Sequence, residues 1–244
     1  MGAKWQTGKL NCLVVQWRVN EGGSTSNRCV YAYECLVHSM MKPILKNKRN
    51  GKKNLATQVE QIRQAHPDCD VQLWAMDEHR AGLKPVMRRV WVDEWTTPIA
   101  KVNWKFEWLW LYAFVHPDSG QTYWWILPYV NTGLFSQVLA DFAAHFKVGK
   151  TKRVALVVDQ AGWHTSEQVQ LPEGIDLIFL PAYSPELQPA ERLWTLTNES
   201  VANRSFKNLD ELEEVLMYRC RQLLKRPEFI QGLTRYHWWA SVTA

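Results

Sequence analysis

The stretch KRVALVVDQ, residues 152–160, decides which fold the chain is expected to adopt. Its apolar, valine-rich residues lack the polar and apolar alternation of a half-exposed strand, which is typical of a central strand covered on both faces. The run ends in an acid, Asp159. Because α/β proteins usually bind ligands at the carboxyl ends of such strands, an acid at this position indicates a functional site.

Further strands and helices are expected on both sides of this stretch. The segment VQLWAMD (71–77) is typical of a strand and also ends in an acid, Asp77. Other strands are expected at 88–92, 98–104, 107–116, 121–128 and 175–181, and helices at 55–67, 132–147, about 189–203 and 209–225. This order predicts an α/β domain with a mixed central sheet and helices on both faces.

A third acid stands in the proline-rich loop LPAYSPELQPAERLW, residues 180–194. Glu191 follows the last proline and begins a predicted helix. If the strands that carry Asp77 and Asp159 are neighbours, the two acids lie close together, and the helix after the next strand can bring Glu191 to them. Each acid on its own equally suits a structural role, in a turn, at a helix cap or at the positive end of a helix dipole.

Three converging carboxylates repel one another, which raises their pKa values unless a cation neutralises them. Oxygen ligands suit Mg²⁺ or Mn²⁺. Two such ions about 4 Å apart can activate an attacking oxygen and stabilise a leaving oxygen at a phosphodiester. Asp77, Asp159 and Glu191 therefore favour two Mg²⁺ or Mn²⁺ ions and in-line phosphoryl transfer on nucleic acid. The sequence has no glycine-rich phosphate loop, so nucleotide hydrolysis is not indicated.

Positive charge is concentrated near the start of the chain. Residues 1–53 hold 10 Lys and Arg against 2 acids, although the net charge of the whole chain is only +5. The run KNKRNGKK (46–53) supplies half of these basic residues, namely Lys46, Lys48, Arg49, Lys52 and Lys53. Such a run forms either a solvated linker or an arm that binds DNA phosphates without sequence preference.

Cysteine content and hydropathy indicate a cytoplasmic protein. The five cysteines are odd in number and include no C-x-x-C pair, so neither a disulfide framework nor a zinc site is expected. The most apolar early segment, residues 29–45, is too short and too polar to cross a bilayer, and the basic start and cleavage site of a signal peptide are lacking. We therefore expect no membrane partner.

Three motifs then resemble a known family. DQAGWHTS (159–166) and LPAYSPELQPAERLW (180–194), with WAMDEHRAGL (74–83) upstream, resemble the catalytic domain of DDE superfamily transposases of bacterial insertion sequences related to the mariner group. The resemblance runs from about residue 55 to about residue 226. It implies a ribonuclease-H-like domain that cleaves transposon ends with two divalent ions and then joins the freed 3′-hydroxyl to target DNA.

The resemblance also implies residue roles and partners. Asp77, Asp159 and Glu191 match the catalytic, metal-binding acids, and Glu186 is a loop residue outside the ligand set. His164, Trp163 and Tyr183 would support the site or contact DNA, although a packed structural histidine is an equal alternative for His164. The implied partner is double-stranded DNA, as transposon ends and target, bound by a homodimer in the nucleoid of a bacterial cell.

The expected domains are an N-terminal segment, residues 1–54, which ends in the basic linker, and a catalytic domain, residues 55–244. The first segment does not read as the helix-turn-helix module that usually precedes the catalytic domain in this family. We therefore hypothesise a catalytic half from a truncated, split or frameshifted reading frame. Two alternatives stay open: a ribonuclease-H-like nuclease or resolvase without strand transfer, and a catalytically silent remnant that only binds DNA.

Overall fold

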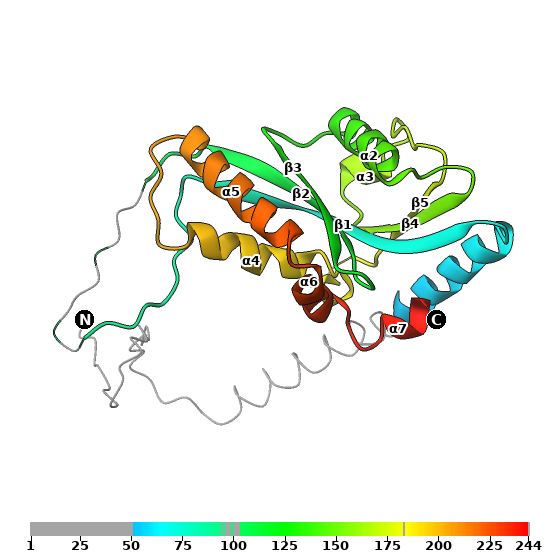
Figure 1. The fold of residues 1–244 in the computed structure, drawn as a ribbon. Helices are drawn as coiled ribbons and strands as arrows, with labels where there is room; N and C mark the ends of the chain where they lie inside the picture. Colours follow the sequence, from blue (N-terminus) through cyan, green and yellow to red (C-terminus); the bar gives the residue numbers. More distant parts are fainter. Residues whose placement is uncertain (1–50, 94, 96–98, 100–102, 183, 244) are drawn as a thin grey trace, which may run out of the picture.

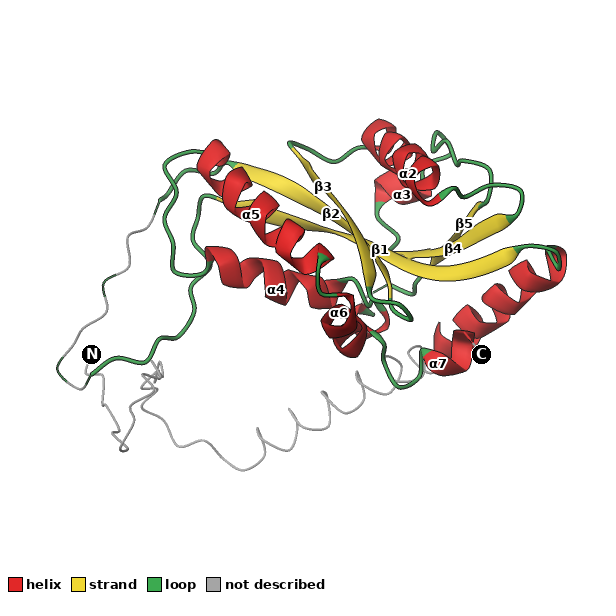
Figure 2. Ribbon diagram, in the orientation of Figure 1, coloured by secondary structure: helices red, strands yellow, loops and turns green. Residues whose placement is uncertain are grey.

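The computed structural model describes residues 51–93, 95, 99, 103–182 and 184–243, which build a five-stranded sheet covered by helices (Figures 1 and 2). The strands are β1 (Asp70–Gly82), β2 (Trp108–His116), β3 (Gln121–Leu127), β4 (Lys152–Val158) and β5 (Ile175–Phe179). Their order is β3-β2-β1-β4-β5. β1 is antiparallel to β2, as β2 is to β3, whereas β1, β4 and β5 run parallel. The predicted mixed sheet is confirmed.

Helices pack on both faces of the sheet, as predicted. α2 (Thr132–Phe146) and α3 (Gly162–Thr165) lie on one face, and α4 (Glu191–Val201), α5 (Leu209–Leu224) and α6 (Pro227–Thr234) on the other (Figure 2). A helix over residues 51–65 precedes β1, a 3₁₀ turn (Pro185–Leu187) precedes α4, and α7 (Ala240–Thr243) lies beside the first helix (Figure 1). Among the described helices, all are too short or too polar to cross a membrane.

Strand alternation divides the interior into two apolar clusters. In β1, Leu73 and Ala75 join the cluster under α4, α5 and α6, whereas Trp74 and Met76 join the cluster under α2. The aromatic ring of Phe142 in α2 stacks on Phe114 of β2 at 4.4 Å between centroids and meets Trp74 edge-on at 5.1 Å. The central strands are thus buried on both faces, as the run at 152–158 predicted.

Most of the strand predicted at 98–104 lies outside the described residues. The strand predicted at 88–92 is not formed. Residues 88–92 contain only an isolated bridge at Trp91, and the Trp91 side chain is 66% exposed. The prediction was wrong because aromatic and β-branched residues favour strands only where a partner strand and a covering layer are available.

β1 also extends further than expected. The prediction ended it at Asp77, but the strand continues to Gly82 because residues 75–82 pair with residues 108–115 of β2. Only the parallel pairing with β4 stops early, at Ala75 opposite Val157. Asp77 therefore lies at the end of the parallel part of the sheet and not at the end of its strand.

The cluster under α2 is expected to carry much of the stability. Replacing Phe142 with Ala should lower the free energy of unfolding by about 3–5 kcal/mol, because Phe142 is fully buried and leaves a cavity among aromatic neighbours. The matched control is Phe229→Ala in α6, where the ring is 52% exposed and the loss should stay below about 0.5 kcal/mol. Urea denaturation followed by circular dichroism measures both, and equal losses would contradict this assignment of the core.

Candidate active site

Asp77 and Asp159 are brought together by the register of β1 and β4. Ala75 pairs with Val157, and each acid lies two residues beyond that last pair, Asp77 within β1 and Asp159 just after the end of β4. Because side chains alternate along a strand, Asp77 belongs to the sheet face on which Ala75 packs, the face covered by α4, whereas Asp159 follows the end of β4 and its carboxylate contacts His164 of α3. Glu191, the first residue of α4, begins on the same face as Asp77. The three predicted acids thus come from adjoining elements.

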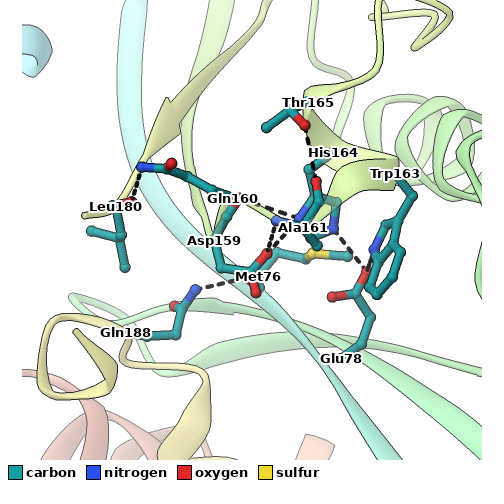
Figure 3. A network of polar contacts seen from close by, with 10 residues as sticks. All are labelled: Met76, Glu78, Asp159, Gln160, Ala161, Trp163, His164, Thr165, Leu180 and Gln188. Atoms are coloured by element: carbon teal, nitrogen blue, oxygen red, sulfur yellow. Dashed lines mark hydrogen bonds and ion pairs between the residues drawn. The ribbon is translucent and has the colours of Figure 1, made fainter. Parts of the chain in front are cut away.

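A buried glutamine holds the proline-rich loop against the sheet. Gln188 is 3% exposed, and its Nε2 donates to the carbonyl oxygen of Met76 at 2.9 Å (Figure 3). Leu187, just before it, is 1% exposed in the core. The loop is therefore fixed next to Asp77, three residues before Glu191. Sequence reasoning recognised the proline-rich loop but missed this hydrogen bond.

A second contact joins α4 to β1. The indole Nε1 of Trp194, one turn after Glu191, donates to Asp77 Oδ2 at 2.7 Å. The indole also stacks on the His79 ring, with 5.0 Å between centroids and 16° between planes. Asp77 is thereby held toward α4. The sequence places Trp194 three residues after Glu191 on the same helix, which is the one signal that could have indicated it.

Asp159 is held by α3, whose His164 also contacts Glu78, a second acid of β1 (Figure 3). Its Oδ1 accepts from the backbone N–H of Ala161 at 3.0 Å and lies 2.8 Å from Nδ1 of His164. The other ring nitrogen, Nε2, lies 2.8 Å from Glu78 Oε1, which also accepts from Trp163 Nε1 at 3.0 Å. His164 and Trp163 thus lie next to Asp159, and both contact Glu78, which sequence reasoning did not select as a site residue.

The carboxyl groups influence one another electrostatically. Burial, with a smaller contribution from the nearby charges of Glu78 and Glu191, raises the pKa of Asp77 to about 7 against the lowering effect of the Trp194 hydrogen bond. Burial also raises the pKa of Glu191, with Glu186 and Asp159 as further causes. The hydrogen bond from His164 lowers the pKa of Asp159. Two of the three acids therefore lack sufficient compensating positive charge.

This donor set fits an oxygen-preferring cation. A bound divalent ion would offset the burial and the like charges that raise the pKa of Asp77 and Glu191. Mg²⁺ and Mn²⁺ prefer carboxylate and water ligands, and Asp77, Asp159 and Glu191 supply the carboxylates. Within the described part of the chain, no three His, Cys, Asp or Glu side chains already converge at metal-binding geometry. Shared coordination by these acids therefore requires their side chains to rotate.

The side chain of His164, beside Asp159, is fully buried. The remaining predicted residues belong to the basic run or lie outside the described residues. Lys52 lies over the ring of Trp238, 5.2 Å from its centroid, and Lys53 is exposed. The other predicted residues, Lys46, Lys48, Arg49 and Tyr183, lie outside the described residues.

Comparison with known proteins identifies the family. A family model described as "DDE superfamily endonuclease" matches residues 72–213, more than half of the chain. The chain belongs to this family. The match includes Asp77, Asp159 and Glu191, the three acids that adjoin in the structure. The predicted DDE superfamily membership is thus confirmed.

Relatives of this DDE superfamily chain include one curated protein and several solved structures. The uncharacterized protein y4pE/y4sA of Sinorhizobium fredii (strain NBRC 101917 / NGR234) is 30% identical over 132 residues, which are 54% of this chain and 96% of that protein. The mariner Mos1 paired end complex with Mg is 17% identical with a TM-score of 0.52, and the match covers 98% of this chain and 68% of that one.

A pre-cleavage Mos1 transpososome is similar to the same degree. It is 17% identical with a TM-score of 0.52, and the match covers 81% of this chain and 62% of that one. The present chain thus spans about two thirds of the length of these solved chains. At such identities the likeness concerns the fold, and it confirms the predicted ribonuclease-H-like class for this DDE superfamily member.

Asp77 is expected to reduce stability at neutral pH in the absence of metal. Its pKa rises from the ordinary 3.8 to about 7 on folding, so the folded chain binds more protons than the unfolded chain between these values. Stability from this group is therefore present near pH 4 and is lost as the pH rises to about 7. Asp77→Asn keeps an acceptor for Trp194. Its free energy of unfolding should exceed that of the wild type by about 1–3 kcal/mol at pH 8 and should equal it at pH 4.

Thermal melts in a metal chelator at the two pH values test this. Added Mn²⁺ should stabilise the wild type at pH 8 and stabilise Asp77→Asn much less, because the ion needs the carboxylate. An Asp77→Asn variant that is less stable than wild type at pH 8 would contradict the assigned cost of this buried acid.

Proposed function

We propose that the chain is the catalytic domain of a transposase that cleaves DNA at transposon ends with divalent metal ions and joins the freed end to target DNA. The main support is that Asp77, Asp159 and Glu191, predicted from three separate motifs, adjoin at the end of the parallel pairing of β1 and β4. The similar Mos1 structures include a paired end complex with Mg and a pre-cleavage transpososome.

The roles follow from the positions of the three acids. Asp77, Asp159 and Glu191 would hold two Mg²⁺ or Mn²⁺ ions, which supply charge stabilisation for the attacking and leaving oxygens of a phosphodiester. The side chain of Asp159 is 56% exposed, so a DNA strand can approach it from solvent. Trp194 and Gln188 hold Asp77 and the Glu191 loop in fixed relative positions. Positioning of this kind is a large part of catalysis in phosphoryl transfer.

A nuclease that cleaves without joining is the second candidate. The description of the matching family, an endonuclease, favours cleavage and does not require strand transfer. Both candidates use the same acids and the same phosphoryl-transfer chemistry. The fate of the 3′-hydroxyl after cleavage is the property that separates them.

The proposed partner is double-stranded DNA, bound by a homodimer. The basic run that contains Lys52 and Lys53 would contact phosphates without sequence preference, which predicts that affinity for random duplex falls steeply with added salt. Changing Lys46, Lys48, Arg49, Lys52 and Lys53 to Gln should reduce the slope of log affinity against log salt concentration by up to about five, the number of charges removed. Fluorescence anisotropy at several salt concentrations measures the slope, and an unchanged slope would exclude this arm.

Cleavage by the wild type and two site variants tests the catalytic proposal. With Mg²⁺ or Mn²⁺ and a labelled duplex that carries the element's own ends, Asp159→Asn and Glu191→Gln should each reduce cleavage at least 100-fold, because each removes a proposed metal ligand. Glu186→Gln changes a carboxylate in the same loop that the resemblance places outside the ligand set, and it should stay within a few-fold of wild type.

Product analysis then separates the candidates. Cleavage followed by joining to a target duplex supports the transposase, whereas cleavage without joining supports the nuclease. Cleavage that persists in Asp159→Asn and Glu191→Gln, or that is lost equally in Glu186→Gln, would refute the proposed site. Absence of cleavage with both Mg²⁺ and Mn²⁺ would favour a catalytically silent chain that only binds DNA.

A further inference from the structure

We propose that Glu78 is a positioning residue of this active site, which acts on Asp159 through the buried ring of His164. The inference deepens the proposed function and rests on it, because it takes Asp159 as a metal ligand. Glu78 is not among the three acids of the motif. The structure nevertheless connects it to Asp159 through a single side chain.

The connection is short and shielded from solvent at one end. His164 lies 2.8 Å from Glu78 Oε1 on its Nε2 side and 2.8 Å from Asp159 Oδ1 on its Nδ1 side. The exposed fraction of the side chain is 0% for His164 and 4% for Glu78, but 56% for Asp159. A buried carboxylate is thus joined through a buried ring to an acid that faces solvent (Figure 3).

The partners of the His164 ring restrict it to one orientation. Carboxylate oxygens accept hydrogen bonds, so an imidazole between two of them donates from both nitrogens. Turning the ring over would put a carbon atom opposite one carboxylate and break a contact. The ring also packs on Phe135, with 4.4 Å between centroids. Glu78 itself is held by the indole N–H of Trp163, which donates to the same Oε1 at 3.0 Å.

The fixed ring in turn restricts the Asp159 carboxylate. Oδ1 is engaged twice, by His164 and by the backbone N–H of Ala161. Oδ2 accepts no hydrogen bond from the residues for which side-chain contacts are described, so it is the oxygen available to a ligand. Replacing a residue that orients a metal ligand through hydrogen bonds typically lowers metal affinity or activity 10- to 100-fold.

Strand alternation places Glu78 on the face of the sheet opposite to Asp77. Glu78 follows Asp77 directly in β1, so the two side chains point to opposite faces of the sheet. Asp77 contacts Trp194 on α4, whereas Glu78 contacts Trp163 and His164 on α3. This placement sets Glu78 apart from the face that carries Asp77 and Glu191.

The first test measures Mn²⁺ binding to the full chain by calorimetry, without DNA. Glu78→Gln has nearly the same shape but loses the charge that faces His164, and it should weaken Mn²⁺ binding 10- to 100-fold. Asp176→Asn is the control, because it breaks the ion pair with Arg153 at 2.9 Å, which does not include Asp159. The control should bind Mn²⁺ within about 2-fold of wild type. Unchanged binding by Glu78→Gln would overturn the proposal.

A double-variant cycle distinguishes positioning from direct binding. If Glu78 acts only through His164, Glu78→Gln added to His164→Gln should change Mn²⁺ affinity by no more than about 2-fold. Independent losses that multiply would show that Glu78 acts directly, and would overturn the proposal. Should Glu78→Gln fail to fold, Trp163→Phe removes the N–H that holds Glu78 and keeps an aromatic ring beside His164. It should weaken Mn²⁺ binding several-fold, and unchanged binding would again overturn the proposal.

The readout also separates this proposal from the proposed function. A wild type that binds Mn²⁺ but cleaves no DNA refutes the proposed reaction, and the Glu78 series still decides the positioning role by calorimetry. A wild type that binds no Mn²⁺ at millimolar concentration overturns the positioning role, because Asp159 then has no ion to hold. Cleavage assays on the same variants should show a higher Mn²⁺ requirement for Glu78→Gln than for Asp176→Asn.

Discussion

The parallel pairing of β1 with β4 is the constraint on which the site depends. It runs from Asp70 opposite Lys152 to Ala75 opposite Val157. Two residues beyond this last pair lie the two acids, Asp77 within β1 and Asp159 just after the end of β4. A slip of one residue in this register would move one acid along the sheet and expose the wrong side chains, and the two buried clusters oppose such a slip. Apolar packing far from the acids therefore sets the distance between them.

The site is also a place where the fold accepts an unfavourable arrangement. Burial raises the pKa of Asp77, and Glu191 adds to the effect although it begins a helix whose dipole favours a negative charge. Hydrogen bonds from Trp194 and Gln188 connect these elements. They fix the positions of the acids without neutralising them. A site with surplus negative charge and fixed geometry is suited to bind a cation, and it lowers the stability of the chain until the cation binds.

Sequence patterns were sufficient for strands and helices whose own apolar residues show the pattern of a buried element, such as 152–158 and 132–146. They failed at 88–92, where aromatic residues favour a strand but no full ladder forms. They also ended β1 at Asp77, because the polar residues that follow are typical of a turn. Those residues are in a strand only because β2 is available to pair with them. Availability of a partner is a property of the whole fold and leaves no local signal.

The same limit applied to the residues around the acids. Asp77, Asp159 and Glu191 could be found from strand ends, a proline-rich loop and a family resemblance. Gln188 could not, and for Trp194 only its helical spacing from Glu191 was a signal, because their hydrogen bonds reach 112 and 117 residues along the chain. A motif records the residue types that a site needs at each position. The contacts that hold those residues are visible only once the chain has folded.

Strand alternation explains how one strand can serve two layers at once. Asp77 and Glu78 are consecutive, so one side chain meets the layer of α4 and the other meets the layer of α3. The Asp77 side brings in Trp194 and the start of α4. The Glu78 side reaches Asp159 through His164. A dipeptide in the middle of the sheet thus connects both helical layers to one set of acids, and a displacement of either layer would be transmitted to the site through the backbone of β1.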